Sequence, residues 1–384
     1  MILLEKYELK EMFKGMGIPF FDLKNQNLKI KFEAMGKFSE IFDSGTFILG
    51  EEVTIFEKNA AGYLGTKHAI GVSSGTDAIL VALMALGIRE SDEVICPSFT
   101  FFATASAVVR LGGIPVFVDI DLTDFNILWG KICEKISTKT KAILVAHLFG
   151  QTASMDEIVK IGHRFNIPVI EDCAQSFGAK RHKRQSGTFG NIGCFSFFPT
   201  KNLGGFGDSG LVCTDDDGIA EKIKILRVHG MNPRYFHRHI GGNFRIDELQ
   251  AGLLNVKLPH VEAYITNRRN NASIYLEALN GLKSIVLPKE IEGNFHTWNQ
   301  FTIRVLDGKR DEVCKALRAN DIGYNIYYPL PLDAQECLKP FVDPQKLTPN
   351  AMLASKEVLS LPIYPELTSD QIFHVVTTLK KILH

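Results

Sequence analysis

The feature that most restricts the fold of this chain is an alternation of short apolar runs and helical segments between Glu51 and Val212. The apolar runs that we predict as buried strands are Val94–Cys96, Pro115–Val118, Ala142–Ala146 and Pro168–Ile170. The helical segments between them are Ala78–Leu86, Phe101–Leu111 and Met155–Phe165. Buried strands that alternate with helices are typical of a parallel, doubly wound sheet with helices on both faces. The sequence therefore predicts an α/β fold.

The rest of the chain is predicted to complete this unit and to add a smaller one. Two further strands flank a glycine-rich turn, at Cys194–Phe198 and Gly210–Cys213, and a mostly helical stretch follows over Glu221–Asn271. A second, α+β unit is indicated by a strand and a helix, at Gln300–Val305 and Lys309–Asn320. We expect a large domain over residues 18–265, a small C-terminal domain over 266–384 and an N-terminal extension over 1–17.

Composition narrows the kind of partner and compartment that such a protein would have. The 384 residues include 43 Lys and Arg and 43 Asp and Glu, so the formal charge is zero, whereas nucleic-acid-binding domains are usually basic. No apolar run reaches the ~18 residues of a membrane span, and Glu5 and Lys6 stand where a signal peptide is apolar. The seven cysteines include no C-x-x-C pair, which favours reduced thiols. We expect a cytoplasmic protein that binds no nucleic acid, membrane or metal.

Ser74 and Asp77 have the spacing of a capping box, which predicts that a helix begins here. Gly75 and Thr76 lie between them, and a helix N-terminus of this composition offers free N–H groups and a hydroxyl to an anion. The segment could therefore hold a phosphate group. It could equally be a well-capped helix that binds no ligand.

Two carboxylates, Glu171 and Asp172, directly follow the predicted strand Pro168–Ile170. Open α/β sheets bind ligands outside the carboxyl ends of their parallel strands, so Asp172 is suited to a binding role. Gln175 lies three residues further on and could reach the same ligand. Glu171 and Cys173 are expected to point away from it as packing residues. The alternative for Asp172 is an acid that merely ends a strand.

Lys201 emerges from a predicted strand into a turn rich in phenylalanine and glycine. Partial burial lowers the pKa of an amine, because desolvation disfavours its charged form. A neutral amine can attack a carbonyl and form a covalent imine. The alternative is a lysine that reaches solvent along its own aliphatic chain.

Together these segments supply what pyridoxal 5'-phosphate (PLP) requires of an enzyme. Lys201 would bind the cofactor aldehyde, Asp172 would keep the pyridine nitrogen protonated, and the helix start at Gly75 would hold the phosphate. Phe101 is the candidate aromatic platform against the ring. The segment Gly205–Gly210 fits G-x-G-x-x-G, but a strand-like run follows it where a dinucleotide-binding site needs a helix.

The chain resembles the DegT/DnrJ/EryC1/StrS family of sugar aminotransferases over about residues 18–383. The segments that carry the resemblance are Gly45–Gly50, Ser74–Ala78, Glu171–Ser176, Ser196–Gly204, Gly242–Arg245, Glu248–Ala251 and Leu359–Pro362. The 29-residue spacing of Asp172 and Lys201 is also similar to that of the family. The resemblance implies a fold-type-I PLP-dependent transferase that is active as a homodimer, with two active sites at the subunit interface.

The resemblance also implies roles for the candidate residues. Lys201 and Asp172 would be catalytic, with Lys201 bound to the cofactor aldehyde and Asp172 to the pyridine nitrogen, while Gln175 would lie beside the phenolic oxygen of the ring. Gly75, Thr76 and Ser196 of one subunit would hold the phosphate, together with Asn243 of the partner subunit.

The resemblance further implies that Arg245 lies beside Asn243 and faces the substrate. Residues i and i+2 of a non-helical stretch point to the same side, which suits a shared reach across a subunit interface. A salt bridge or turn within one subunit is the alternative for both. Tyr324 and Tyr327 are further candidate substrate contacts. Relatives often have histidine at the position of Asp333, and some have it at that of Tyr327, which leaves the substrate open.

For the reaction, the resemblance implies transfer of an amino group from L-glutamate to a keto group of a nucleotide-linked sugar. The expected acceptor is a 3-oxo sugar, of the UDP-linked 2-acetamido kind used for surface polysaccharide, and a 4-oxo acceptor is the main variant. A PLP-dependent sugar dehydratase, whose known form lacks the lysine, and a non-enzymatic regulatory protein remain as other classes. The basic run Lys180–Arg184 is either a solvated loop or a contact for a diphosphate or a nucleic acid. The run Arg234–His239 precedes Asn243 and is a candidate contact for the diphosphate of the nucleotide.

Overall fold

The centre of the molecule is a seven-stranded, mainly parallel sheet, seen in a computed structural model that describes residues 17–342 and 348–383. Residues 1–16, nearly all of the expected N-terminal extension, lie outside the described residues. In spatial order the strands are β1 (His68–Val72), β9 (Gly210–Thr214), β8 (Ile192–Ser196), β5 (Val169–Asp172), β4 (Thr140–Ala146), β2 (Glu93–Pro97) and β3 (Ile114–Val118). Only the pairs that involve β9 are antiparallel.

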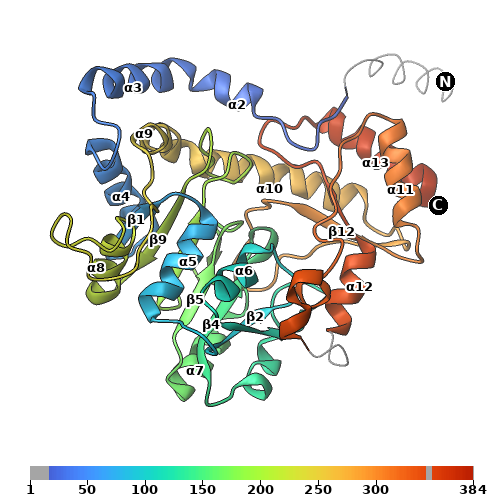
Figure 1. The fold of residues 1–384 in the computed structure, drawn as a ribbon. Coiled ribbons are helices and arrows are strands. Elements are labelled where there is room, and N and C mark those ends of the chain that lie inside the picture. The colour runs from blue at the N-terminus through green and yellow to red at the C-terminus, as the bar shows by residue number, and fades with distance from the viewer. Residues whose placement is uncertain (1–16, 343–347, 384) are drawn as a thin grey trace.

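Both faces of this sheet are buried. Successive side chains of each strand point to opposite sides, so one strand contributes to the core on both faces. In β4, Ala142 and Leu144 pack in one core cluster, whereas Ile143 and Val145 pack in another. The first face is covered by α5 (Gly75–Leu86), α6 (Ala103–Arg110) and α8 (Asp217–Leu226). The other face is covered by α7 (Met155–Phe165), α4 (Glu51–Leu64) and α9 (Glu248–Lys257). Figure 1 shows this three-layer arrangement, and the predicted α/β fold is confirmed.

Two features of the large unit differ from the sequence prediction. Strand β1 was not predicted, although it pairs along its whole length with β9. The stretch Glu221–Asn271 was predicted as mostly helical, but its middle, residues 227–247, contains no helix. At Gly230 the backbone has φ of 73°, and a Cβ there would collide with the carbonyl of His239. The chain therefore folds back on itself between α8 and α9.

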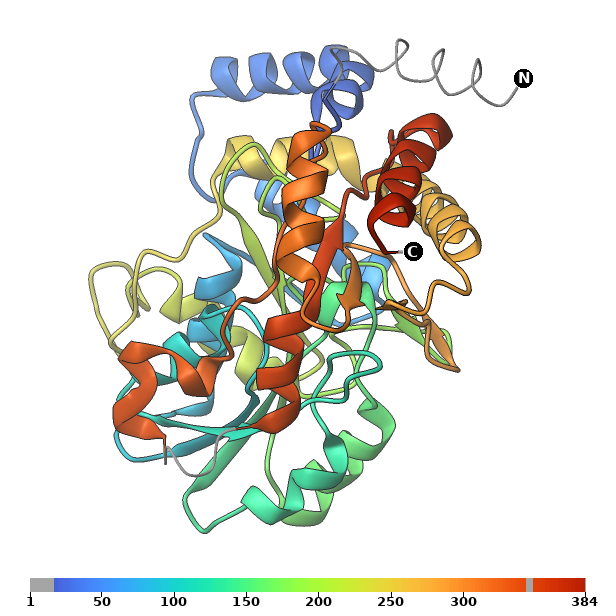
Figure 2. The same cartoon turned by 90° about the vertical axis from the view of Figure 1, so that its right-hand side faces the viewer.

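A second core lies towards the C-terminus. It surrounds a three-stranded antiparallel sheet of β10 (Ile285–Val286), β12 (Phe301–Val305) and β13 (Val358–Leu361). The helices around it are α11 (Arg310–Ala319), α12 (Pro349–Glu357) and α13 (Ser369–Leu383), which Figure 2 turns towards the viewer. The expected domain boundary at residue 265 falls inside α10 (Val261–Ala278), whose first half packs in the core of the large unit and whose second half packs in this one. Ile18, expected in the large domain, also packs here and pairs with Ile322.

Short elements connect these units. A small sheet is formed by β6 (Lys180–Arg181), β7 (Arg184–Gln185) and β11 (Asn294–Phe295), so the basic run Lys180–Arg184 is a hairpin. The 3₁₀ helices are Trp129–Lys131, Cys133–Lys135, Leu148–Gly150, Leu258–His260, Leu332–Ala334 and Glu336–Phe341.

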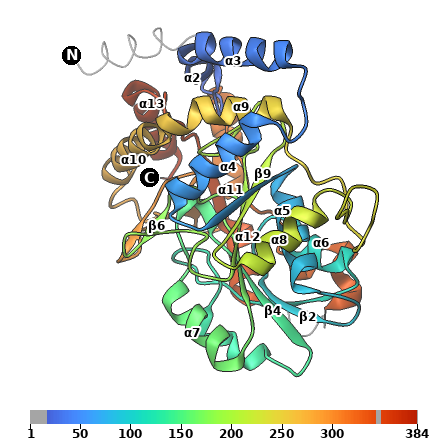
Figure 3. The same ribbon diagram turned by 90° about the vertical axis from the view of Figure 1, so that its left-hand side faces the viewer.

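Helices α2 (Lys24–Lys29) and α3 (Lys31–Ser44) lie along the outside of the molecule, next to α9 (Figures 1 and 3). Their exposed apolar face, which we call the α2–α3 face, consists of Leu28, Phe32, Met35 and Phe42. Large exposed apolar surfaces often mark contacts with another protein chain. Among residues 17–342 and 348–383, no helix has the length and apolar character needed to cross a membrane.

Candidate active site

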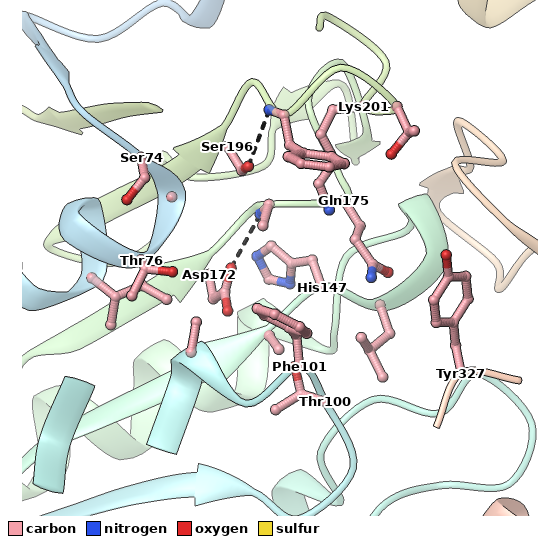
Figure 4. A pocket seen from close by; sticks show the side chains of 18 of the residues that line it. Ser74, Thr76, Thr100, Phe101, His147, Asp172, Gln175, Ser196, Lys201 and Tyr327 are labelled. Carbon is pink, nitrogen blue, oxygen red and sulfur yellow. Dashed lines mark hydrogen bonds between the residues drawn. The ribbon is translucent and has the colours of Figure 1, made fainter. Parts of the chain in front are cut away.

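A cavity of about 410 Å³ opens at the carboxyl ends of β2, β4, β5 and β8. This is the edge at which open α/β sheets bind ligands, and the volume is in the range of small-molecule sites. The residues predicted from the sequence that line it are Gly75, Thr76, Phe101, Asp172, Gln175, Ser196, Lys201 and Tyr327. Figure 4 shows most of these side chains around one opening, although they come from segments that are far apart in the chain, from Gly75 to Tyr327. The fold therefore brings together eight of the candidates.

The start of α5 forms one wall of this cavity. Ser74 is the N-cap residue, and its hydroxyl oxygen accepts the N–H of Asp77 at 3.0 Å, as the capping-box spacing predicted. The first intrahelical hydrogen bond runs from the N–H of Ala78 to the carbonyl of Ser74. The N–H groups of Gly75 and Thr76 precede it and have no helical acceptor. They are therefore available to an anion such as the phosphate of PLP.

Gly75 is required at this position by the close approach of β8. A Cβ built on Gly75 would lie 2.6 Å from the Cβ of Ser196, the last residue of that strand. The absence of a side chain thus lets the helix start and the hydroxyl of Ser196 face the same small space. These groups form a cradle that fits a phosphate and that a larger residue would fill.

Asp172 ends β5 and is almost fully buried, with 6% of its surface exposed. Its Oδ2 accepts the hydroxyl proton of Thr104 at 2.9 Å, and its Oδ1 accepts the N–H of Ala174 at 3.1 Å. Burial raises the pKa of Asp172, while these two hydrogen bonds and the charge of Lys201 oppose that rise. The carboxylate keeps further acceptor capacity on the cavity side, which fits a protonated ring nitrogen.

Lys201 follows β8 and lines the same cavity (Figure 4). Desolvation lowers the pKa of its amine to about 8, against the opposing effect of the Asp172 charge. A substantial fraction of the amine is therefore neutral near physiological pH, as nucleophilic attack on an aldehyde requires. The turn itself is held by Asn202, whose amide donates to the carbonyl of Phe177 at 3.0 Å and to the hydroxyl of Thr297 at 2.8 Å.

Gln175 is oriented by hydrogen bonds on both ends of its amide. Its Oε1 accepts the N–H of Phe149 at 2.8 Å, so its Nε2 is the end that donates to the hydroxyl of Tyr328 at 3.0 Å. The Tyr328 hydroxyl thus keeps its own proton for another acceptor. Burial raises the pKa of Tyr328, which keeps that proton in place. Phe101, the predicted platform, is 57% exposed and has its ring centroid 6.5 Å from that of Tyr328.

A second polar cluster adjoins the cavity and consists of His147, which lines the cavity, and of Glu171 and Cys173, which do not. The Nδ1 of His147 accepts the N–H of Ala153 at 3.1 Å, so its proton is on Nε2 and is donated to Glu171 at 2.8 Å. Glu171 also accepts the N–H groups of Gly187 and Gly190. Burial and the charge of Glu171 raise the pKa of Cys173 well above its usual range.

Of the described residues, these three are the group of histidine, cysteine and carboxylate side chains close enough together to hold a metal ion. Both ring nitrogens of His147 and the carboxylate of Glu171 are already hydrogen-bonded, and the Cys173 thiol is protonated. The cluster is therefore built for packing. Glu171 and Cys173 lie where the sequence placed them, directed away from the cavity.

Three predicted residues do not line the cavity of their own chain. Asn243 and Arg245 lie on the extended segment after the fold-back loop, where they pair with Val228 and Val72. Within the described part of the chain, the side chains of Asn243 and Arg245 have no hydrogen-bond partner. Tyr324 is also outside the cavity, and its hydroxyl accepts a hydrogen bond from Arg318 at 2.9 Å.

Sequence reasoning missed His147, Thr104 and Tyr328. His147 directly follows the predicted strand Ala142–Ala146, so the rule that selected Asp172 could have found it. Tyr328 is adjacent to Tyr327 and could have been considered with it. Thr104 lies within a helix, 68 residues from Asp172, and no local pattern signals their contact.

The chain is similar to known sugar aminotransferases over nearly its whole length. A sequence model described as the DegT/DnrJ/EryC1/StrS aminotransferase family matches residues 29–380. A UDP-N-acetyl-3-dehydro-alpha-D-glucosamine 3-aminotransferase of Acidithiobacillus ferrooxidans is 41% identical over 97% of this chain and 100% of its own length. A "pleiotropic regulatory protein" of Geobacillus stearothermophilus is 44% identical over 94% of this chain and 97% of its own. The crystal structure of S. venezuelae DesV in complex with a ketimine intermediate superposes with a TM-score of 0.92 at 36% identity, covering 95% of this chain and 98% of that one.

Proposed function

Since the chain belongs to the DegT/DnrJ/EryC1/StrS aminotransferase family, we propose that it transfers the amino group of L-glutamate to the 3-oxo carbon of a nucleotide-linked sugar. The enzyme is a PLP-dependent sugar aminotransferase of fold type I. The observation that carries the proposal is the cavity itself, in which an amine with a pKa of about 8, a buried carboxylate and a helix N-terminus meet. The identity to a UDP-sugar 3-aminotransferase favours a UDP-linked 2-acetamido sugar as acceptor. Surface polysaccharide is the destination that we propose for the product.

The residues that line the cavity fit PLP group by group. The phosphate would be held by the N–H groups of Gly75 and Thr76 and by the hydroxyl of Ser196. The ring nitrogen would donate to Asp172, and Gln175 would lie beside the phenolic oxygen. When bound, PLP supplies an electron sink that eases removal of a proton from the α-carbon of an amino donor.

The chain's own contribution to the reaction is to orient the reactants and to move a proton. The neutral Nζ of Lys201 would accept the proton of the donor α-carbon and return it to the carbon atom of the cofactor that carried the aldehyde oxygen, a role for which a pKa near the working pH is best suited. The carboxylate of Asp172 keeps the ring nitrogen protonated. Phe101 would cover the ring at the mouth of the cavity, and Tyr327, which also lines the cavity, would contact the sugar.

The charges of the cavity support a homodimer with shared sites. Among the described residues, Lys201 is the one lysine or arginine that lines it, whereas Asp172 and Asp208 both add negative charge. A phosphate dianion and the carboxylates of glutamate need further cations or amides. We propose that Asn243 and Arg245 of the partner subunit supply them, and that the exposed α2–α3 face contributes to the contact between subunits.

Mixed subunits test this sharing. Lys201→Ala and Asn243→Ala chains are each expected to be inactive, but a mixed dimer has one intact site, built from the Lys201 of one subunit and the Asn243 of the other. Random mixing should therefore restore about a quarter of wild-type activity. If each site were built within one subunit, no mixture would regain activity.

Two other classes remain as alternatives to this proposal. A sugar dehydratase of this fold is disfavoured because Lys201 is present and has a lowered pKa. The regulatory name of the Geobacillus relative keeps a DNA-binding role as the second candidate, and the zero net charge argues against it.

We assign the enzyme to the cytoplasm because all seven cysteines are free thiols.

The deciding experiment incubates the purified protein with PLP, L-glutamate and a set of UDP- and dTDP-linked 3-oxo and 4-oxo sugars. Products are identified by mass spectrometry and NMR, with Lys201→Ala as the control. We expect an amine at C3 of a UDP sugar. An amine at C4 would assign the 4-oxo variant, loss of water without nitrogen gain would assign a dehydratase, and salt-sensitive DNA binding without turnover would assign a regulator.

A further inference from the structure

Thr104 is the side chain that holds Asp172, and it lies just behind the cavity wall. It is fully buried in the first turn of α6, and its hydroxyl lies 2.9 Å from the Oδ2 of Asp172. The residues that line the cavity include its neighbours Thr100, Phe101 and Ala103, but Thr104 is not among them. Thr104 therefore has no direct access to a ligand and can influence one only through Asp172.

The direction of this hydrogen bond follows from the chemistry of the two groups. An ionised carboxylate only accepts, so the single proton of the Thr104 hydroxyl is directed to Asp172. The hydroxyl of Thr100 lies 3.4 Å from that of Thr104, and it must then be the donor of that contact. A short relay of donors thus points at Oδ2, while the N–H of Ala174 donates to Oδ1.

These two donors fix both the plane and the charge state of the carboxylate. A side-chain carboxyl group rotates readily unless both oxygens are held. Donors to the charged form also oppose its protonation, and they do so here against strong desolvation. The other titratable groups that interact with Asp172 are Lys201, His147, Tyr328, Cys194 and Cys173, and the thiol of Cys173 is protonated. Of these, Tyr328 and Cys194 are neutral, and His147 directs its proton to Glu171.

We propose that Thr104 is a positioning residue that keeps the Asp172 carboxylate ionised and aimed at the protonated ring nitrogen of the cofactor. The proposal rests on PLP binding in this cavity, but not on the identity of the sugar. Removing the hydroxyl leaves a buried carboxylate with one donor fewer, which raises the pKa of Asp172. A protonated Asp172 holds the ring nitrogen's proton less well, so the lysine-bound cofactor becomes more basic at its imine nitrogen.

The test compares three variants that separate the hydroxyl from its volume. Thr104→Val keeps the shape and loses the donor, Thr104→Ser keeps the donor and loses a methyl group, and Thr104→Ala loses both. Thr378→Val is the matched control, because it removes a buried helix hydroxyl, bonded to the carbonyl of His374, in the C-terminal core. Two quantities are measured without sugar: the dissociation constant of PLP, and the pH midpoint of the absorbance change of the bound cofactor.

We expect the pH midpoint of Thr104→Val and Thr104→Ala to rise by about one unit and the dissociation constant of PLP to increase roughly tenfold. Thr104→Ser and Thr378→Val should keep wild-type values for both. An unchanged midpoint in Thr104→Val or Thr104→Ala would overturn the proposal, and so would a midpoint in Thr104→Ser that shifts as far as in Thr104→Val. If the wild-type protein itself bound no PLP, the proposed function would fail instead. Should Thr104→Val not fold, the Ser and Ala variants still decide, because they differ in the hydroxyl.

Discussion

Two adjacent carboxylates at the end of β5 lie in different surroundings, one in a hydrogen-bonded cluster and the other at the wall of the cavity. Glu171 lies in the closed cluster with His147 and Cys173, and its oxygens accept three hydrogen bonds from protein donors. Asp172, the next residue, accepts two and borders a cavity of about 410 Å³. The two point in different directions because successive residues of a strand face opposite sides of a sheet.

The difference shows how to separate a structural acid from a functional one. A buried carboxylate costs free energy unless donors satisfy it, and Glu171 has a full set of them within the protein. Asp172 is also buried but incompletely satisfied, and its remaining acceptor capacity faces a space that a ligand can enter.

The largest effect is expected at Lys201, which shares the cavity with Asp172. Lys201→Ala should abolish the borohydride-reducible absorbance of bound cofactor and lower turnover by roughly 10²- to 10⁴-fold, because the amine that binds the aldehyde and moves the proton is gone. Lys257→Met is the control, since Lys257 is also a buried lysine with a pKa of about 8, but it donates to the carbonyl of Gly204 outside the cavity. Retention of the absorbance by Lys201→Ala would show that the cofactor is bound to another lysine and that this cavity is not the active site.

Loss of charge should affect different quantities at the two neighbouring acids, turnover at Asp172 and stability at Glu171. Asp172→Asn should lower turnover by roughly 10²-fold with little change in stability, because it weakens the partner of the ring nitrogen. Glu171→Gln should lower the free energy of unfolding by roughly 2–4 kcal/mol, because its three donors lose a charged acceptor. Steady-state kinetics and urea unfolding measure both. Equal effects of the two changes on both quantities would refute the contrast.

The phosphate cradle should be sensitive to a single methyl group. Gly75→Ala places a Cβ 2.6 Å from that of Ser196, so the dissociation constant of PLP should rise about tenfold or more. Gly62→Ala in α4 is the matched control, because a Cβ at Gly62 has no atom within 4 Å. That change should leave PLP binding unaltered and stabilise the helix by about 0.5–1 kcal/mol. Fluorescence titration with PLP distinguishes the two glycines.

The pH dependence of cofactor loading should report the amine of Lys201. Its pKa of about 8 lies below that of an ordinary lysine, so the covalent reaction of the apoprotein with PLP should accelerate with rising pH and level off above about 8. Because the charge of Asp172 raises this pKa, Asp172→Asn should move the midpoint to lower pH. Stopped-flow absorbance measures the rates. A midpoint near that of exposed lysines, about 10, would contradict the burial effect.

The smallest effect is expected at Tyr324. Its hydroxyl contacts Arg318 outside the cavity, so Tyr324→Phe should change KM for the sugar by less than about twofold. Tyr327→Phe, which alters a residue that lines the cavity, should raise KM several-fold. Comparable KM values for the two variants would require a different substrate path.

Much of this contrast could be read from local patterns. The order of strands and helices followed from apolar runs, the start of α5 from the Ser74–Asp77 spacing, and the position of Asp172 from the strand before it. The fold-back loop between α8 and α9 was missed because helical propensity alone does not register a positive φ such as that at Gly230. The roles of Asn243 and Arg245 remain predictions, since both side chains lie outside the cavity of their own chain.

By itself, the sequence determined the residue types and their order: a lysine, an acid and a helix cap, each next to a strand end, because period and capping depend on neighbours within a few residues. Only the tertiary structure decided which polar groups remain unsatisfied. Hydrogen bonds such as those of Thr104 to Asp172 and His147 to Glu171 join residues 68 and 24 positions apart. Such pairs form only when the sheet brings its strand ends together, so the lowered pKa of Lys201 and the closed state of Glu171 arise from packing that no short segment contains.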